Sequence, residues 1–171
     1  PLLDVDAPEA AEALDDVRGR IDHLINNPGH TRPATFHRRL GEILYTGCGV
    51  SRSEAGLTRA LEQVQELREE FWRDVRVTGT DDRLNQELEK AGRVADFLEL
   101  AELMITDALD RQESCGAHFR EEYALPDGEA KRDDERWCNV SAWETNPAGQ
   151  HRRYQEPLRF ESVKLQVRNY R

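Results

Sequence analysis

The chain has 171 residues and a formal net charge of -10, with 37% hydrophobic and 34% charged residues. This composition can form a single hydrophobic core, and the negative charge argues against general nucleic-acid binding. No run approaches the roughly 20 apolar residues of a membrane-spanning helix. Three cysteines at irregular spacing indicate reduced thiols in a cytoplasmic compartment. Because the sequence starts with Pro1, we expect it to be a piece of a longer protein.

Two amphipathic helices are predicted in the first third of the chain. Asp6 can cap the first helix, which ends at the turn formed by residues 26–29. The second helix starts near Pro33 and ends at Gly47 or Gly49. Apolar residues recur at steps of three and four along both helices and predict their buried faces: Leu14, Val17, Ile21, Leu24 and Ile25 in the first, and Phe36, Leu40, Ile43 and Leu44 in the second.

Two longer helices should follow. Ser51 and Glu54 form a potential capping box for the third helix, which ends before Gly79. Thr80 can cap a fourth helix that continues to about Arg111, roughly 30 residues and longer than the usual helix. Long helices joined by short turns predict an antiparallel bundle. The expected buried positions are Leu57, Leu61, Val64, Leu67, Phe71 and Val75, then Leu84, Leu88, Ala91, Ala95, Leu98, Met104, Ile105 and Leu109.

The character of the chain changes after the fourth helix, where aromatic residues and glycines replace helical periodicity. We expect strands at 137–143 and 150–155, which form a hairpin, and an extended tail over 156–171. The fold class is therefore mainly α: an antiparallel bundle of three to four helices, one of them long, followed by a loop-rich segment with a small β-hairpin and an extended C-terminal tail. The predicted units are residues 1–112 and 113–171.

Few residues suggest chemistry. Cys115 and His118 have the spacing of half a zinc site or of a thiol–imidazole pair, but the sequence offers no second pair of ligands beside Cys138. The histidines at 23, 30 and 37 are separated by a Pro-Gly turn that prevents a common helical face. No glycine-rich phosphate loop and no Ser-His-Asp arrangement is visible. We therefore predict no metal ligand, no cofactor site and no catalytic residue in this chain.

The segment from Arg111 to Trp137 is unusually dense in alternating charges. It reads RQESCGAHFREEY and continues, after a loop, with KRDDERW. Arginine forks are suited to hydrogen-bonded ion pairs in buried or interfacial places. We interpret this segment as a surface whose charged groups pair with groups that the chain itself lacks. The tail at 150–171 has six basic and two acidic residues, a distribution that either serves solubility alone or suits contact with an acidic partner.

These motifs resemble the C-terminal region of the flavoprotein subunit of succinate dehydrogenase and fumarate reductase. That family carries R-x-E-S-R-G-A-H, then R-D-D-E-x-W, and ends on R-x-Y, as Arg168 to Tyr170 does here. LREEFWRDVRV and LNQELEKAGRVADFLELAELM are similar to its last two long helices. Cys115 stands where the commonest version has Arg, and the insertion ALPDGEAK lengthens the loop. Both departures resemble the branch that has a single-chain cytochrome b partner.

The resemblance implies a non-catalytic part of a larger oxidoreductase. In this family the FAD-binding domain, which also grips the dicarboxylate, precedes the helical domain. The helical domain supports it and borders the iron–sulfur subunit, whose clusters carry electrons. A membrane cytochrome b subunit is then an indirect partner, and the location is the cytoplasmic, inner face of the cell membrane. No nucleic acid is expected as a partner, and the chain alone should be inactive.

An alternative from another class stays open: an independent helical adaptor or regulator with no catalytic role. The upstream coding region would separate the two, because only the flavoprotein continues into a dinucleotide-binding fingerprint. Under the flavoprotein interpretation, the residues expected at interfaces are Glu113, Ser114, Cys115, Gly116, His118, Arg120, Arg132, Asp133, Asp134, Arg168 and Tyr170.

Overall fold

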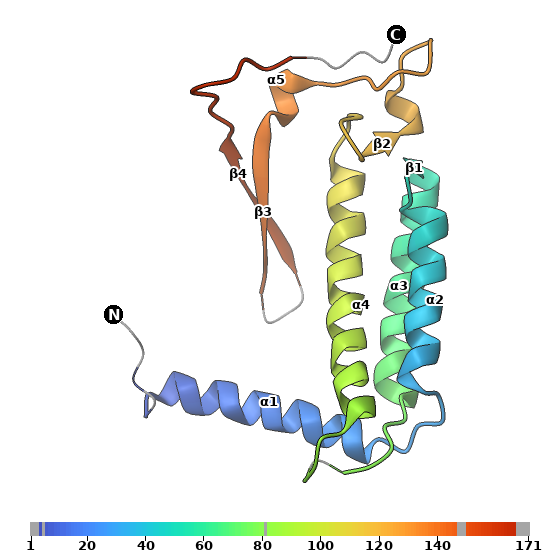
Figure 1. Ribbon diagram of the computed structural model, residues 1–171, viewed down its shortest axis with the longest axis vertical. Helices are drawn as coiled ribbons and strands as arrows, with labels where there is room; N and C mark the ends of the chain where they lie inside the picture. Colours follow the sequence, from blue (N-terminus) through green and yellow to red (C-terminus); the bar gives the residue numbers. More distant parts are fainter. Residues whose placement is uncertain (1–3, 5, 81, 147–149, 167–171) are drawn as a thin grey trace.

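The computed structural model describes residues 4, 6–80, 82–146 and 150–166, and four long helices account for about half of these residues. Helices α2 (Pro33–Gly47), α3 (Glu54–Asp74) and α4 (Gln86–Asp110) lie side by side as an antiparallel bundle, and α1 (Pro8–Asn26) crosses its base and projects to one side (Figure 1). The prediction of a mainly α fold with a helix bundle is confirmed.

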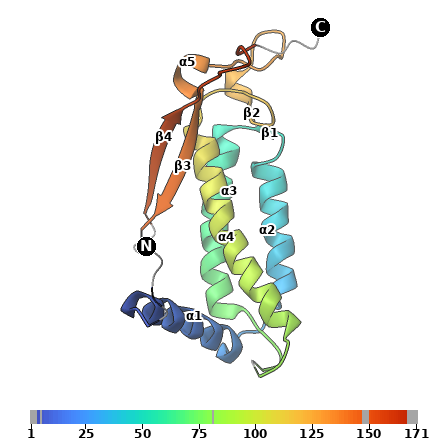
Figure 2. The ribbon, with the colours of Figure 1, turned by 60° about the vertical axis from the view of Figure 1, so that its left-hand side comes forward.

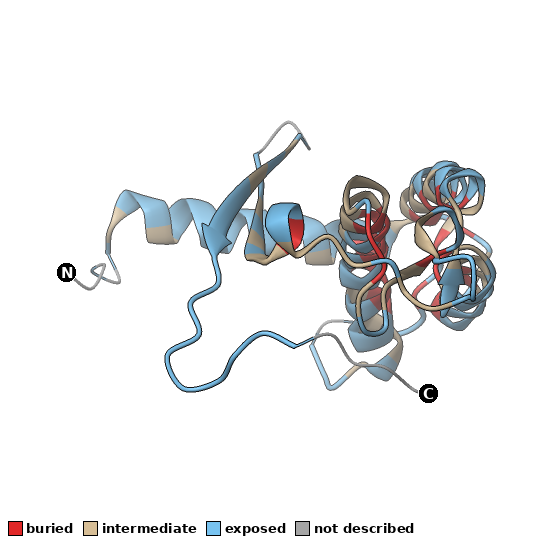
Figure 3. Cartoon of the chain, turned by 90° about the horizontal axis from the view of Figure 1, so that it is seen from above, coloured by how far each residue is buried: buried red, intermediate tan, exposed pale blue. Residues whose placement is uncertain are grey.

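The hydrophobic core fills the space between α2, α3 and α4, where the buried positions of the three helices face one another (Figure 3). Phe36 of α2 meets Phe71 of α3 edge to face, with ring centroids 5.3 Å apart. Most apolar positions predicted for these helices are buried, whereas Leu84 and Met104 are exposed. The fully buried core includes Phe36, Leu40, Leu57, Val64, Leu67, Phe71, Val75, Ala91, Ala95, Leu98 and Ile105.

The apolar stripe of α1 predicts that this helix packs into the core, but most of the stripe lies outside it. Of its residues only Leu24 is buried, whereas Leu14 and Val17 are 49% and 55% exposed. Its C-terminal half is held to the bundle by Arg20, which donates to Asp96 of α4 over 2.6 Å. The N-terminal half of the stripe has no cover from the described residues, because α1 points away from the bundle (Figure 2).

The cap of α3 lies two residues later than predicted. The side chain of Ser53 accepts a hydrogen bond from the amide of Gly56 at 3.2 Å, which satisfies a free donor of the first turn. Ser51 instead donates to Glu121 across 2.7 Å. The predicted capping box of Ser51 and Glu54 is therefore wrong, because Ser51 belongs to a short strand that faces another segment.

The starts of α1 and α4 also differ from the predictions. Asn85, not Thr80, caps α4: its side chain accepts hydrogen bonds from the second and third residues of the helix, which has 25 residues. Ala7, not Asp6, precedes α1, and it makes no side-chain cap. The loop before α4 is thus longer than the sequence suggested, and the helix correspondingly shorter.

The predicted hairpin is present. Strands β3 (Asn139–Thr145) and β4 (His151–Pro157) pair antiparallel, with Trp143 opposite Arg153. Both strands start later than predicted, and the hairpin lies along α4 (Figure 2). Two contacts fix it there: the indole Nε1 of Trp143 donates to Asp107 at 2.7 Å, and Arg153 forms an ion pair with Asp110. The hairpin turn at 147–149 lies outside the described residues.

Short elements at the end of the bundle escaped prediction. Strand β1 (Ser51–Arg52) pairs in parallel with β2 (Phe119–Arg120), followed by the 3-10 turn η1 (Glu121–Tyr123) and the four-residue helix α5 (Asp134–Trp137). They connect the start of α3 to the segment after α4, and the division of the chain at residue 112 stays a prediction. Within the part of the chain that the structure describes, no helix is long and apolar enough to cross a membrane.

Candidate interface site at the end of the bundle

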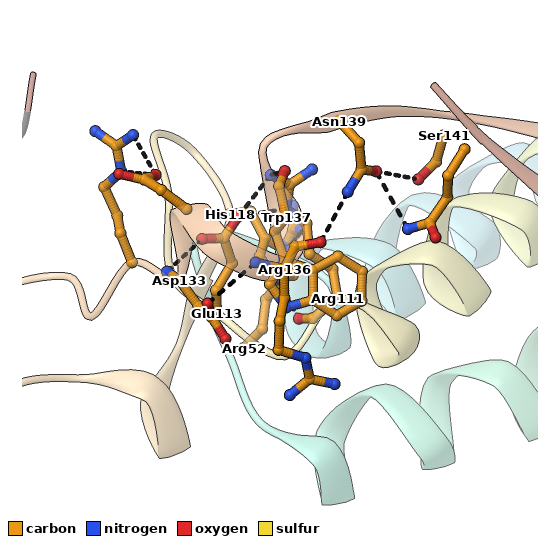
Figure 4. A network of polar contacts seen from close by, with 12 residues as sticks. Arg52, Arg111, Glu113, His118, Asp133, Arg136, Trp137, Asn139 and Ser141 are labelled. Carbon is orange, nitrogen blue, oxygen red and sulfur yellow. Dashed lines mark hydrogen bonds and ion pairs between the residues drawn. The ribbon is translucent and has the colours of Figure 1, made fainter. Parts of the chain in front are cut away.

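Nine of the predicted interface residues lie in one stretch, residues 111–138, which we call the end segment. It folds over the C-terminal end of α4 and the N-terminal end of α3 (Figure 1). Its charged and polar side chains form the network shown in Figure 4. The other two predicted residues, Arg168 and Tyr170, lie outside the described residues.

Arg120 is the central buried group of the end segment. It is 1% exposed, and its Nη1 donates to the carbonyl oxygens of Ala108 at 2.8 Å and Leu109 at 3.2 Å. These carbonyls belong to the last turn of α4, where helical partners are missing and the helix dipole is negative. The Nε of Arg120 donates to Glu122 over 3.1 Å. One guanidinium therefore closes the end of the longest helix.

Glu122 connects Arg120 to the start of α3. One of its carboxylate oxygens accepts a hydrogen bond from the backbone amide of Glu54 at 2.6 Å, at the positive end of that helix. Although burial acts in the opposite direction, the hydrogen bonds from Glu54 and Arg120 hold the pKa of Glu122 below its usual value. The carboxylate is therefore the charged link between the ends of α3 and α4.

Glu113 organises the other half of the network. Its side chain is 2% exposed, and one oxygen accepts from Arg111 at 2.9 and 2.5 Å. The second oxygen accepts from the amide of Asp133 across 2.9 Å. Arg111 also donates to the carbonyl of Trp137 at 3.2 Å (Figure 4). Burying a carboxylate is costly unless its oxygens are hydrogen-bonded, and both oxygens of Glu113 are.

Ser114, Cys115 and Gly116 form the turn between these groups. The fully buried Ser114 hydroxyl accepts from the amide of Arg120 at 2.8 Å and donates to its carbonyl at 3.1 Å. Cys115 and His118 exchange backbone hydrogen bonds at 2.8 and 3.1 Å. Gly116 has a φ of +60°, which favours glycine. Cys115 therefore has a place in a tight turn and is half-buried.

His118 uses both ring nitrogens within the chain. Nδ1 lies 2.9 Å from the guanidinium of Arg52, which can only donate, so Nδ1 accepts. Nε2 then carries the hydrogen and donates to the carbonyl of Arg111 at 2.9 Å. Burial and the nearby charges of Arg52, Arg111 and Arg120 lower the pKa of His118, although the hydrogen bond to the Arg111 carbonyl acts in the opposite direction. This geometry does not fit a metal ligand, since neither nitrogen has a free lone pair.

The last group of predicted residues lies beside α5. Arg132 donates to Asp134 at 2.9 and 2.5 Å and to the carbonyl of Gln166 at 3.0 Å, which fixes the tail at that point. Asp133 caps α5 by accepting from the amide of Arg136 at 3.2 Å. Within the described ranges, no group of three or more His, Cys, Asp or Glu side chains is placed to hold a metal ion.

The expectation that these charges pair with groups outside the chain is wrong for Glu113, His118, Arg120, Arg132 and Asp134. Each of the five has a partner within the end segment or at the helix ends. The reason is local: arginine is followed two positions later by an acid at 111, 120 and 132, and all three pairs close. That spacing was the signal that could have identified them. An interface role for the segment stays a prediction.

Two functional neighbours of the network were missed from the sequence. Arg52 gives His118 its hydrogen-bond donor, but it lies 66 residues away along the chain. Glu122 accepts from the first turn of α3 although it comes from another segment. Arg52 reaches His118 through the pairing of β1 with β2, and no local sequence pattern predicts that pairing.

Comparison with known proteins agrees with this fold. A family described as the C-terminal region of fumarate reductase flavoprotein matches residues 37–170. The fumarate reductase flavoprotein subunit of Proteus vulgaris is 30% identical over 162 residues, which cover 92% of this chain and 25% of that protein. The succinate dehydrogenase flavoprotein subunit of Rickettsia bellii is 27% identical over 142 residues, which cover 83% of this chain and 23% of the relative.

A solved structure has the same arrangement of elements. An Escherichia coli quinol fumarate reductase chain matches with a TM-score of 0.79 and 27% identity, over 96% of this chain and 27% of the solved one. The match therefore includes nearly all described elements. The chain spans about a quarter of the length of the curated relatives it matches.

Proposed function

Because the chain belongs to the family of fumarate reductase flavoprotein C-terminal regions, we propose that it serves as the helical part of the flavoprotein subunit in an enzyme that interconverts succinate and fumarate. In this role it supports the FAD-binding domain of the same polypeptide and borders an iron–sulfur subunit. A membrane cytochrome b subunit is then an indirect partner, on the cytoplasmic side. The chain contributes no reacting group of its own.

The described residues do not fit FAD itself. A dinucleotide pyrophosphate usually binds at a free helix N-terminus that follows a glycine-rich turn. Here the N-terminus of α3 is taken by the side chains of Ser53 and Glu122, and that of α4 by Asn85. Helices α1 and α2 start with Pro8 and Pro33, which lack a donor, and neither start follows a glycine-rich turn. The flavin site of the parent enzyme is therefore proposed to lie in the rest of the polypeptide.

The uncovered face of α1 is the observation that carries the supporting role. The apolar stripe runs without interruption from the buried Leu24 to the exposed Leu14 and Val17. A solved chain roughly three and a half times as long matches over 96% of this chain, so the projecting α1 is compatible with a much larger protein. A stripe of apolar side chains at helical spacing is stabilised by burial against another element. We propose that the FAD-binding domain supplies that element.

The end segment suits a different kind of contact. Three of its arginines are already paired with acids and its buried polar groups are hydrogen-bonded, so it offers a polar surface of fixed shape rather than an apolar one. Polar surfaces of fixed shape are typical of the rim of a subunit interface. We propose that this end of the bundle, with the basic tail fixed by Arg132, faces the iron–sulfur subunit.

The test uses the complete flavoprotein subunit assembled with its partners. Leu14→Asp places a charge in the α1 stripe, whereas Glu12→Gln changes an exposed residue on the opposite side of the same helix. We expect Leu14→Asp to lose bound flavin and succinate–dye reductase activity, and Glu12→Gln to retain both. Full flavin content and activity in Leu14→Asp would contradict the proposed support by α1.

A further inference from the structure

The imidazole of His118 is surrounded by positive charge. Arg52 from β1 donates to its Nδ1 at 2.9 Å, Arg111 at the end of α4 offers its carbonyl to Nε2, and Arg120 of β2 lies close enough to affect its titration. The ring is half-buried. These elements come from three parts of the chain, so His118 lies where they are fastened together (Figure 4).

The acids near His118 compensate two of these arginines, whereas Arg52 is the cation that directly faces the imidazole. Glu113 is bonded to Arg111, and Glu122 to Arg120 and to the amide of Glu54. Glu121 of η1 accepts from Ser51, and the thiol of Cys115 belongs to the same turn as the histidine. Arg52 donates to the carbonyl of Gly49 and to the imidazole. A proton added to Nδ1 would therefore meet the guanidinium of Arg52 directly.

We propose that His118 is an acid-sensitive clasp, which in its neutral form joins the turn at 115–118 to β1 and on protonation releases that turn from the start of α3. The proton comes from solvent and binds Nδ1, which then can no longer accept from Arg52. Two cations at hydrogen-bond distance separate, and the two-residue pairing of β1 with β2 is then left to the hydrogen bonds of Glu121 with Ser51 and of Glu122 with the amide of Glu54. This inference concerns the chain itself and does not depend on the proposed function.

The direction of the pH effect follows from the ring's surroundings. An unperturbed histidine titrates near pH 6.5, and the environment of His118 lowers its folded pKa. Below about pH 6.5, His118 binds a proton more readily in the released state than in the closed state, in which it is bonded to Arg52. The closed state therefore becomes less stable relative to the released state as the pH falls towards the folded pKa. At neutral and alkaline pH both states hold neutral imidazole, and the clasp is closed.

The first experiment observes the wild-type chain at two pH values. Long-range proton–nitrogen NMR at about pH 7.5 should show His118 in the Nε2–H form, the tautomer that accepts at Nδ1. Hydrogen exchange of the Cys115 and His118 amides, corrected for the intrinsic pH dependence, should accelerate about tenfold between about pH 7.5 and pH 5. The Nδ1–H tautomer, or exchange that does not change, would overturn the proposal.

Two variants separate the clasp from general acid sensitivity. His118→Gln keeps an acceptor for Arg52 and a donor for Arg111 without titrating in this range, so the acceleration should disappear. Arg52→Met removes the facing cation and should reduce it. His37→Gln, at an exposed position of α2, is the control and should behave as wild type. The same tenfold acceleration in His118→Gln, or its loss in His37→Gln, would contradict the clasp.

Discussion

Gly29 lies against the backbone of Asp74 so closely that a Cβ at position 29 would be 2.2 Å from the carbonyl oxygen of Asp74. The turn between α1 and α2 is thereby seated on the end of α3. The amides of His30 and Thr31 both donate to that same carbonyl, at 3.1 and 3.0 Å. The contact is made by backbone atoms, which cannot rotate away as a side chain does.

Gly29→Ala should therefore destabilise the chain by about 3 kcal/mol, because overpacking at rigid backbone forces the turn off α3. Urea unfolding followed by circular dichroism measures this. Gly41→Ala is the matched control, since a Cβ there meets nothing within 4 Å and the position is inside helix α2. The control should gain about 0.5–1 kcal/mol from helix propensity. Equal stability of Gly29→Ala and wild type would show that the turn can shift freely.

Arg120→Ala should destabilise the isolated chain by about 2–3 kcal/mol, because it leaves the last carbonyls of α4 and one carboxylate oxygen of Glu122 without their donor. Arg132→Ala serves as the comparison: Arg132 is half-buried and its main partner is the neighbouring Asp134, so the loss should stay within about 1 kcal/mol. Thermal melts of both variants check the ranking. A melting temperature for Arg120→Ala no lower than that of Arg132→Ala would contradict the capping role.

The bundle core could be predicted from the sequence because helical spacing alone specifies which side chains share a face. Phe36, Val64, Phe71 and Leu98 were placed in the core in this way and are all buried. The same reasoning could not place α1. The apolar stripe that contains Leu14 predicts that this face is buried, but it does not show which element packs against it.

Local caps and distant pairings limited the prediction of the site. Ser51 and Ser53 are both good caps two residues apart, and only the pairing of β1 with β2 decides between them. The end segment was found from its charge density, but its charged groups were expected to pair with groups outside this chain. The short spacing of each arginine to its acid, as in Arg120 and Glu122, was the overlooked signal.

Asp74 should contribute to stability in a pH-dependent way. Hydrogen bonds from the hydroxyl of Thr31 and the amide of His30 hold its pKa below the usual value. A carboxyl with a lowered folded pKa stabilises the chain above its unfolded pKa, about 3.9, and the contribution is lost as the pH falls through the folded pKa. The unfolding free energy should therefore decline with acid over this window, and less steeply in Asp74→Asn.

Urea titrations at several pH values between about 6 and 2.5 measure the two slopes. Glu70 and Glu122 also have lowered pKa values, so the wild type and the variant should share the part of the decline that these groups cause. The difference between the curves belongs to Asp74. Parallel curves over the whole range would show that the turn at Thr31 does not depend on the charge of Asp74.

Trp143 holds the hairpin to the bundle through one hydrogen bond from its indole to Asp107 of α4. Trp143→Phe keeps an aromatic ring in place but removes the donor, so the carboxylate of Asp107 loses its partner on the hairpin. Because an isolated two-stranded hairpin is marginal in water, we expect faster hydrogen exchange across β3 and β4 with little change in α2 and α3. Trp72→Phe, on α3, is the control, since it should leave the exchange of β3 and β4 as in wild type. Unchanged exchange in the hairpin of Trp143→Phe would mean that the ion pair of Arg153 with Asp110 is sufficient to hold it.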